Sequence, residues 1–447
     1  MPTLRAVPPE TRYATSGDAR IAYQVVGEGP VDLLFVPSFL SNIELGWEHA
    51  SIAAFSNRLA RFSRLILFDR RGNGMSDGLA GESTLEEQVD DVRAVLDAAG
   101  AREAAILAIN EGARLALLFA ASHPESVRAL VLAAPVPRLV RGPGYEWALS
   151  PEEREARIGE LVASWGRDVP GNAWVAMGGD DPELHAAMTR YQRLASGPNG
   201  AAATLLRAAE TDVRGVLGSI QCPTLVMRRS GDEEIDVRHS RCVVEGIPGA
   251  RFVEVGGEGQ VWVGDPEEPG REIEAFLTGS PPRAASERVL ATVMFTDIVG
   301  STALASELGD GRWRELLGRH DAIVREEVER HRGRVVKSLG DGALSLFDGP
   351  SRAIGCALAL RGRLGAISLP IRAGLHTGEC ELLADGDVGG MAVHIGARIA
   401  ALAEPDEVLA SRTVRDLSIG SPFTMDDRGE HELKGVAEPW RIYAAGS

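Results

Sequence analysis

A short segment near residue 280 divides this 447-residue chain into two parts with different hydrophobic patterns. Residues 278–287 read TGSPPRAASE, and a run so rich in Pro, Gly, Ala and Ser is typical of a linker. A chain of this length also exceeds one ordinary core, so two domains are expected. We therefore predict domains at residues 1–279 and 288–447, with a linker at 280–287.

The first part alternates expected strands with helices. Residues 84–99 carry apolar side chains at helical spacing and predict a helix. Short apolar runs predict buried strands at 21–26, 31–37, 64–69, 104–109, 129–134, 224–228 and 251–255. Repeated β–α units predict a mostly parallel sheet with helices on both faces.

The alternation stops between residues 141 and 213. A helical insert is expected there, and it carries Trp147, Trp165, Trp174 and Tyr191. An aromatic insert of this kind suggests a cap over a pocket, and such a pocket suits a small apolar ligand.

Three motifs of the first part resemble the α/β-hydrolase fold: FDRRGNGMSD at 68–77, PTLVMRRSGD at 223–232 and WVGD at 262–265. The resemblance spans residues 12–279 and implies that fold. Enzymes of this fold place a Ser nucleophile within G-x-S-x-G on a tight strand-to-helix turn, followed along the chain by an acid and a His.

The positions that correspond to this triad are occupied by Asn110, Asp232 and Gly259. Asn tolerates positive φ, so the turn is expected to keep its shape, but a carboxamide is no nucleophile. The only His of the first part beyond the acid, His239, follows Asp232 by seven residues. A scaffold or ligand-sensing domain without hydrolase activity is therefore favoured over a hydrolase with a rearranged triad.

The second part opens with RVLATVMFTDIVGST at 288–302, which predicts a buried strand ending at Asp297. Gly300, Ser301 and Thr302 then leave free backbone N–H groups at the start of a helix, and such groups attract phosphate. Asp297 could hold Mg²⁺ beside them. The alternative is that this carboxylate only caps the helix.

A second carboxylate, Asp341, lies in the turn KSLGDG of a hairpin expected at 335–347. Alone, Gly-Asp-Gly is commonly just a turn. On adjacent strands, however, Asp297 and Asp341 could bridge two metal ions, the usual clamp for displacement at phosphorus. Other elements complete an α+β domain, with helices at 311–330, 350–364 and 391–402 and strands at 370–376 and 407–410.

Four motifs of the second part, FTDIVGST, KSLGDG, GDVGGMAVHIGAR and HELKGV, resemble the class III nucleotidyl cyclases and follow that family's order. The resemblance implies a homodimer through the cyclase domains, with active sites between them and two Mg²⁺ or Mn²⁺ ions in each. Asp297, Asp341 and the carbonyl of Ile298 would be metal ligands. Lys434 would meet the terminal phosphates.

Lys337 and Asp387 stand at the family's base-reading positions. Adenine offers an acceptor at N1 and a donor at N6, which one donor and one acceptor side chain can read, whereas guanine presents the reverse pair. ATP is therefore the expected substrate. The alternatives are an exposed strand Lys and an ordinary loop Asp.

Arg398 matches the family's transition-state Arg, and His394 stands where the family usually has Asn. On a helix the two side chains share one face, and a neutral imidazole N–H can donate much as an amide does. The alternative is that His394 packs under the helix.

The composition of the chain argues against two other classes of protein, those that bind nucleic acid and those that span a membrane. A net charge of −17 and a pI near 5.1 argue against nucleic-acid binding, which selects basic faces. No apolar run approaches the length of a membrane span, so a cytoplasmic protein is expected. The expected activity is that of an adenylate cyclase, a phosphorus–oxygen lyase, joined to a regulatory or scaffolding domain. A ligand-sensing module with weak or no cyclase activity is the alternative.

Overall fold

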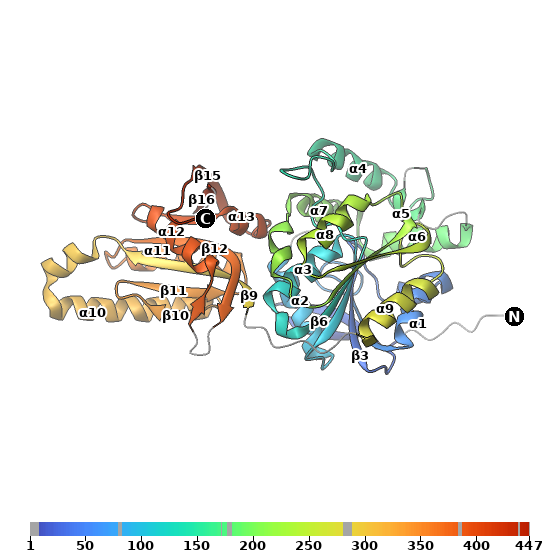
Figure 1. Cartoon of the computed structure of the whole chain (residues 1–447), viewed down its shortest axis with the longest axis horizontal. Coiled ribbons are helices and arrows are strands. Elements are labelled where there is room, and N and C mark those ends of the chain that lie inside the picture. Colours follow the sequence, from blue (N-terminus) through green and yellow to red (C-terminus); the bar gives the residue numbers. More distant parts are fainter. Residues whose placement is uncertain are drawn as a thin grey trace. The chain divides into compact units, whose positions relative to one another are not determined.

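The computed structural model describes residues 9–78, 83–170, 172–176, 181–279, 288–382, 387–436 and 439–446. The chain forms two compact units, Met1–Ala285 and Ser286–Ser447 (Figure 1). The linker predicted at 280–287 lies outside the described residues. Within the described ranges, no helix is long and apolar enough to cross a membrane.

The first unit is built on an eight-stranded sheet of order β1-β2-β4-β3-β5-β6-β7-β8. Its strands are β1 (Arg12–Ser16), β2 (Ala19–Val26), β3 (Val31–Val36), β4 (Ser63–Phe68), β5 (Ala104–Ile109), β6 (Val127–Ala133), β7 (Thr224–Gly231) and β8 (Arg251–Glu258). The pairs β1–β2 and β2–β4 are antiparallel. All other neighbouring strands of this sheet pair in parallel. This confirms the predicted mostly parallel sheet. Strand β1 was not predicted, because its five residues carry little apolar periodicity.

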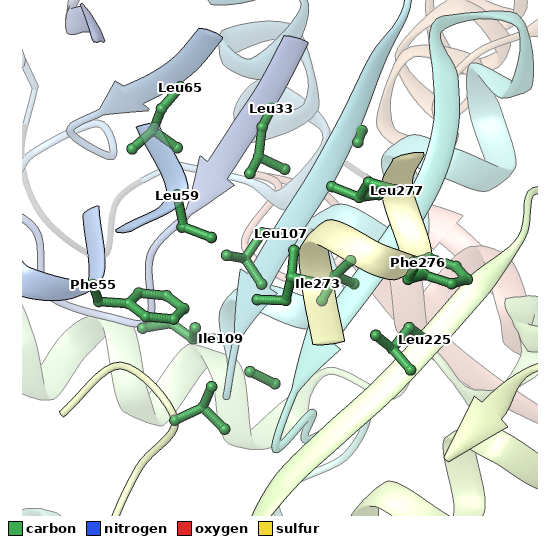
Figure 2. Close-up of a cluster of buried hydrophobic side chains, with 14 of the residues drawn as sticks. Leu33, Phe55, Leu59, Leu65, Leu107, Ile109, Leu225, Ile273, Phe276 and Leu277 are labelled. Atoms are coloured by element: carbon green, nitrogen blue, oxygen red, sulfur yellow. The ribbon is translucent and has the colours of Figure 1, made fainter. Parts of the chain in front are cut away.

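Helices cover both faces of this sheet (Figure 1). They are α1 (Ala50–Ala60), α2 (Leu85–Ala98), α3 (Gly112–Ser122), α8 (Val237–Gly246) and α9 (Glu267–Gly279). Figure 2 shows the core on the face covered by α1 and α9, where Phe55 and Ile273 meet Leu107 of the central strand β5. Each such side chain contributes about 1.5–3 kcal/mol by leaving water, so this core stabilises β5, the strand that leads into the turn at Asn110.

The helical cap lies between β6 and β7, as predicted, although residues 171 and 177–180 fall outside the described part of the cap. Its helices are α4 (Pro151–Ala163), α5 (Ala173–Ala176), α6 (Pro182–Ala195) and α7 (Pro198–Glu210). The start of α4 is stabilised by a capping box between Ser150 and Glu153. Trp174 and Tyr191 of the cap pack against Leu40 and Trp262 of the sheet domain.

The second unit has a sheet of order β10-β11-β9-β12-β14-β16-β15, with the short β13 paired to β12. Its strands are β9 (Arg288–Ile298), β10 (Arg334–Ser338), β11 (Gly342–Phe347), β12 (Ile371–Leu382), β13 (Val388–Gly389), β14 (Val408–Ser411), β15 (Thr424–His431) and β16 (Trp440–Gly446). Its helices are α10 (Ser301–Arg330), α11 (Pro350–Gly365), α12 (Met391–Leu402) and α13 (Arg412–Leu417). The predicted α+β organisation is therefore confirmed.

Two features of this unit differ from the sequence-based expectation. The helix expected to start after Gly300 and the helix expected at 311–330 form one element, α10, which Gly309, with φ 74° and ψ 161°, interrupts. Strands β15 and β16 were not predicted. Most residues of β15 are exposed and polar, so no apolar alternation marks it as a strand.

Candidate active site

The pairing of β9 with β11 brings Asp297 and Asp341 to one end of the sheet. Asp297 lies near the end of β9, and Gly342, the residue after Asp341, is its direct partner on β11. The backbone N–H of Ile298 donates to the Asp341 carbonyl at 3.0 Å. A Cβ at position 342 would lie 2.1 Å from the Thr296 carbonyl oxygen, so only Gly permits this close approach.

Each carboxylate is held by a polar neighbour. Ser301, at the start of α10, donates its hydroxyl to Asp341. Arg372 lies opposite Asp297 on β12, and its Nε and Nη2 donate to Asp297 Oδ2 at 2.9 and 2.6 Å. Arg372 was not predicted as a site residue, because its contact with Asp297 follows from the β9–β12 register, which no motif encodes.

The donor atoms at this end of the sheet fit a hard divalent cation. No cluster of three or more His, Cys, Asp or Glu side chains suited to a metal occurs among the described residues. The two carboxylates and the Ile298 carbonyl supply oxygen atoms only, which Mg²⁺ and Mn²⁺ prefer, and such ions usually complete their coordination with water and substrate phosphates. Asp297 would have to share its carboxylate between a cation and Arg372.

The start of α10 offers backbone N–H groups beside these carboxylates. Its N-cap is Gly300, with φ 70°, which has no side chain to cap the first turn. Ser301 and Thr302 follow as the first residues of the helix. A long helix with an open first turn attracts anionic groups, as its N–H groups and dipole favour negative charge.

Lys337 and Asp387 meet although fifty residues separate them in the sequence. Lys337 Nζ lies 2.5 Å from Asp387 Oδ2. The hydrogen bond from Lys337 and then that from the Val388 N–H lower the pKa of Asp387. The two predicted base-reading residues therefore form one ion pair, with the amine and the carboxylate each partly exposed.

His394 and Arg398 lie one turn apart on the exposed face of α12. The opposite face packs inward through Ile395 and Ile399. The alternative that His394 packs under the helix is therefore wrong. Gly396 on that inner face fits closely against β9, because a Cβ there would lie 2.6 Å from a methyl group of Val293.

Lys434 is exposed and follows the buried Leu433, which packs with Ile395 and Ile399 of α12. The segment carrying Lys434 thus lies against the helix that carries His394 and Arg398. Since the inner face of α12 packs on the sheet, His394 and Arg398 face away from the sheet that carries Asp297 and Asp341.

In the first unit, the turn between β5 and α3 keeps the predicted strained geometry. Asn110 has φ 47°, in the left-handed region, and is 8% exposed. Its backbone N–H donates to the Ala133 carbonyl at 3.0 Å, whereas its side-chain Oδ1 has no hydrogen-bond partner among the described residues. Gly112 allows the turn to approach β3, since a Cβ would lie 2.3 Å from the Pro37 carbonyl oxygen.

The other two triad positions form no acid–imidazole pair. Asp232 Oδ1 accepts the N–H groups of Glu234 and Ile235, each at 3.1 Å, and Oδ2 is buried without a hydrogen-bond partner in the described chain. Burial raises the pKa of Asp232. Gly259, with φ 68°, supplies no side chain.

His239 is engaged elsewhere. It lies on α8, and its Nδ1 is 2.7 Å from the Tyr145 hydroxyl. Burial lowers the pKa of this imidazole to about 4. A rearranged triad through His239 therefore finds no support in these contacts.

A buried carboxylate next to the turn was also missed by sequence analysis. Glu111 accepts a hydrogen bond from Ser38 Oγ at 2.5 Å and lies 3.9 Å from Arg154 of the cap. Burial works against ionisation of Glu111, but Arg154 and Arg114 together hold its pKa below the usual value. A charged residue directly after the nucleophile position is the signal that could have pointed to this cluster.

Comparison with known families covers both units. The α/β hydrolase fold family matches residues 33–260, and the adenylate and guanylate cyclase catalytic domain family matches residues 285–444. The chain is a fusion of an α/β-hydrolase-fold domain and a class III cyclase domain.

Relatives of this hydrolase–cyclase fusion include bacterial proteins. One is a Rhizobium meliloti protein named "Putative adenylate cyclase 3", 32% identical over 165 residues, or 35% of the fusion and 28% of that protein. Another is an uncharacterized Mycobacterium tuberculosis protein, 35% identical over 193 residues, or 39% of the fusion and 36% of the relative. The matches span about a third of the length of these relatives.

Solved structures resemble each domain of the hydrolase–cyclase fusion. An esterase from Exiguobacterium antarcticum, 19% identical, aligns with a TM-score of 0.53 over 60% of the fusion and 100% of its own chain. This likeness shows the fold of the first domain. The adenylyl cyclase CyaB from Pseudomonas aeruginosa, 24% identical, matches with a TM-score of 0.35 over 37% of the fusion and 97% of its own chain.

Proposed function

We propose that the protein is an adenylate cyclase that converts ATP into 3′,5′-cyclic AMP and pyrophosphate. The observation that carries this proposal is the meeting of Asp297 and Asp341 beside the open start of α10. This arrangement gathers oxygen donors for cations and N–H donors for phosphate at one end of a sheet. Membership of the cyclase family supports the same reaction.

Asp297, Asp341 and the Ile298 carbonyl would hold two Mg²⁺ or Mn²⁺ ions, which when bound would make the ribose 3′-hydroxyl more acidic and neutralise phosphate charge. The N–H groups of Gly300, Ser301 and Thr302 would orient the phosphates, and Lys434 would bind the terminal ones.

Lys337 would donate to adenine N1 while Asp387 accepts from the N6 amino group. Their ion pair supports this role, since one planar base edge could contact both groups together. Arg398 and His394 would stabilise the negative charge that develops on the α-phosphate oxygens as the 3′-oxygen attacks.

We infer that each active site is shared between the cyclase domains of two chains. The outward position of His394 and Arg398 on α12 supports this arrangement, because these side chains face away from the sheet that holds the metal carboxylates of their own domain. A second chain could then supply its own Asp297 and Asp341 to them.

The hydrolase-like domain would regulate or scaffold the cyclase without hydrolysing substrates itself. Asn110 and Gly259 provide neither a nucleophile nor a general base. A ligand-sensing module with weak or no cyclase activity is the second candidate function. The cap aromatic residues Trp174 and Tyr191, which line a cavity over the sheet, favour such sensing.

An assay of the full chain tests these proposals. Purified protein is incubated with ATP or GTP and either Mg²⁺ or Mn²⁺, and cyclic product is measured by chromatography. We expect metal-dependent cyclic AMP that Asp341→Ala abolishes. A folded chain that forms no cyclic nucleotide under any of these conditions would favour the binding module instead.

Hydrolase activity is tested separately with chromogenic esters of several chain lengths. No turnover above that of the Asp232→Asn variant is expected. Saturable hydrolysis that this substitution removes would contradict the non-hydrolytic role.

A further inference from the structure

We propose that the chamber beneath the cap binds a small, uncharged, mostly apolar molecule with a hydrogen-bond acceptor such as a carbonyl oxygen. The indole N–H groups of Trp174 and Trp262 would donate to that acceptor. This ligand class rests on the ligand-sensing role proposed above for the hydrolase-like domain. Binding of the ligand can be measured independently of cyclase activity.

The chamber is a cavity of about 100 Å³ between the carboxyl ends of the central strands and the cap. Phe35 and Ile109 come from β3 and β5, and Met188 comes from α6. An apolar cavity of about 150 Å³ accommodates benzene, which has six heavy atoms, so this smaller one suits a molecule of about four or five heavy atoms.

Two buried donors in the chamber wall lack partners. Trp174 is 8% exposed, and neither its Nε1 nor that of Trp262 has a hydrogen-bond partner within the described chain. Both rings line the chamber, with centroids 5.7 Å apart. A buried N–H without an acceptor is unfavourable, so a ligand that supplies an acceptor gains affinity here.

Tyr191 adds a third donor to the same wall. Its hydroxyl oxygen accepts the Asn42 N–H at 2.8 Å, which leaves the hydroxyl proton to be donated. Its ring stacks against Trp174, with centroids 5.8 Å apart. The cap therefore presents donors from two adjacent aromatic residues.

Three other polar side chains of the wall already have partners. Ser38 donates to Glu111, Asn42 donates to the Leu194 carbonyl, and Trp47 Nε1 donates to Gln24 Oε1 at 2.8 Å. Beside these engaged groups, the indole N–H groups of Trp174 and Trp262 are buried donors without partners in the described chain. Among the described residues, no Lys or Arg side chain lines the chamber, so a buried anion would lack a counter-charge from them. An uncharged acceptor is the remaining match.

A pair of probes of equal shape tests the inference on the full chain. Cyclobutanone carries a carbonyl oxygen where methylenecyclobutane carries a methylene group. We expect ligand-observed NMR titration to show saturable binding of the ketone with an affinity about tenfold higher than that of the hydrocarbon. Equal affinities, or no saturable ketone binding, would overturn the proposal without any variant being needed.

Substitutions then locate the donors. Trp174→Phe and Trp262→Phe keep an aromatic ring but remove the N–H, so each should weaken ketone binding several-fold and leave hydrocarbon binding unchanged. Trp165→Phe is the matched control, because within the described chain the Trp165 Nε1 also lacks a partner and its ring is not among those that line the chamber. An equal effect of Trp165→Phe on ketone binding would contradict the assignment, and melting temperatures verify folding.

Cyclic nucleotide formation with and without the ketone separates the two proposals. Selective ketone binding that leaves cyclase activity unchanged supports the ligand class and contradicts the sensing role. Loss of ketone selectivity in a chain with normal cyclase activity overturns the ligand class alone.

Discussion

At the scale of single residues, Lys337 and Asp387 form a donor–acceptor pair that matches adenine. The double variant Lys337→Glu with Asp387→Cys reverses the hydrogen-bond sense at these positions. It should lower cyclic AMP formation and admit GTP, which is measured as the product ratio from equimolar ATP and GTP. Asp427→Asn, which removes a different exposed ion pair with Arg441, is the control. An unchanged product ratio in the double variant would reject the base-reading role.

His394 and Arg398 have separable roles because they differ in charge. Arg398→Ala removes a fixed cation and should lower kcat by about 10²–10³, the usual effect of losing one transition-state donor. His394→Asn keeps an N–H donor at nearly the same place and should retain activity, whereas His394→Ala should not. Steady-state kinetics with ATP distinguish these outcomes. Equal losses in both His394 variants would show that the imidazole has a role other than donating a hydrogen bond.

At the scale of elements, His376 connects β12 to the start of α13. Its side chain is 4% exposed, and its Nδ1 lies 2.9 Å from the Ser411 hydroxyl. Burial lowers the pKa of His376 to about 4. The unfolded chain therefore binds this proton between about pH 6.5 and pH 4 while the folded chain does not, so stability is present above that range and is lost as pH falls through it.

This predicts a cyclase domain that loses up to about 3 kcal/mol of unfolding free energy between pH 7 and pH 4 through His376 alone. The melting temperature of the full chain should fall on acidification, and His376→Gln should reduce that fall. His431→Gln, which removes a more exposed imidazole of β15, serves as the control. An identical pH dependence in the parent chain and His376→Gln would contradict the prediction.

At the scale of the whole molecule, the proposed shared site predicts complementation between inactive chains. Asp341→Ala removes a proposed metal ligand, whereas Arg398→Ala removes the proposed transition-state cation. Mixing them should restore activity, since a heterodimer retains one site with intact Asp341 from one chain and intact Arg398 from the other. Cyclic AMP is measured after mixing at increasing concentrations. Heterodimers detected by differential tags without recovered activity would rule out sharing.

Much of the fold followed from local pattern. Runs such as 104–109 and 129–134 are apolar along their whole length, and such runs indicate buried parallel strands. Exposed elements such as β15 were not predicted, because a polar strand carries no run or alternation of apolar residues. Likewise, the interruption of α10 at Gly309 depends on a positive φ that Gly permits but does not require.

The sequence by itself determined which functional groups the chain possesses. Asn110 and Gly259 lack the chemistry of a nucleophile and a base in any conformation, whereas Asp297 and Asp341 bring metal-binding oxygen atoms. Only the tertiary structure decided which groups meet. Arg372 reaches Asp297 through strand register, and Trp174 and Trp262 share one wall because the cap folds over the sheet. Strand register and cap packing are set by the free energy of contacts between segments that are far apart in the sequence. No short motif can therefore predict them.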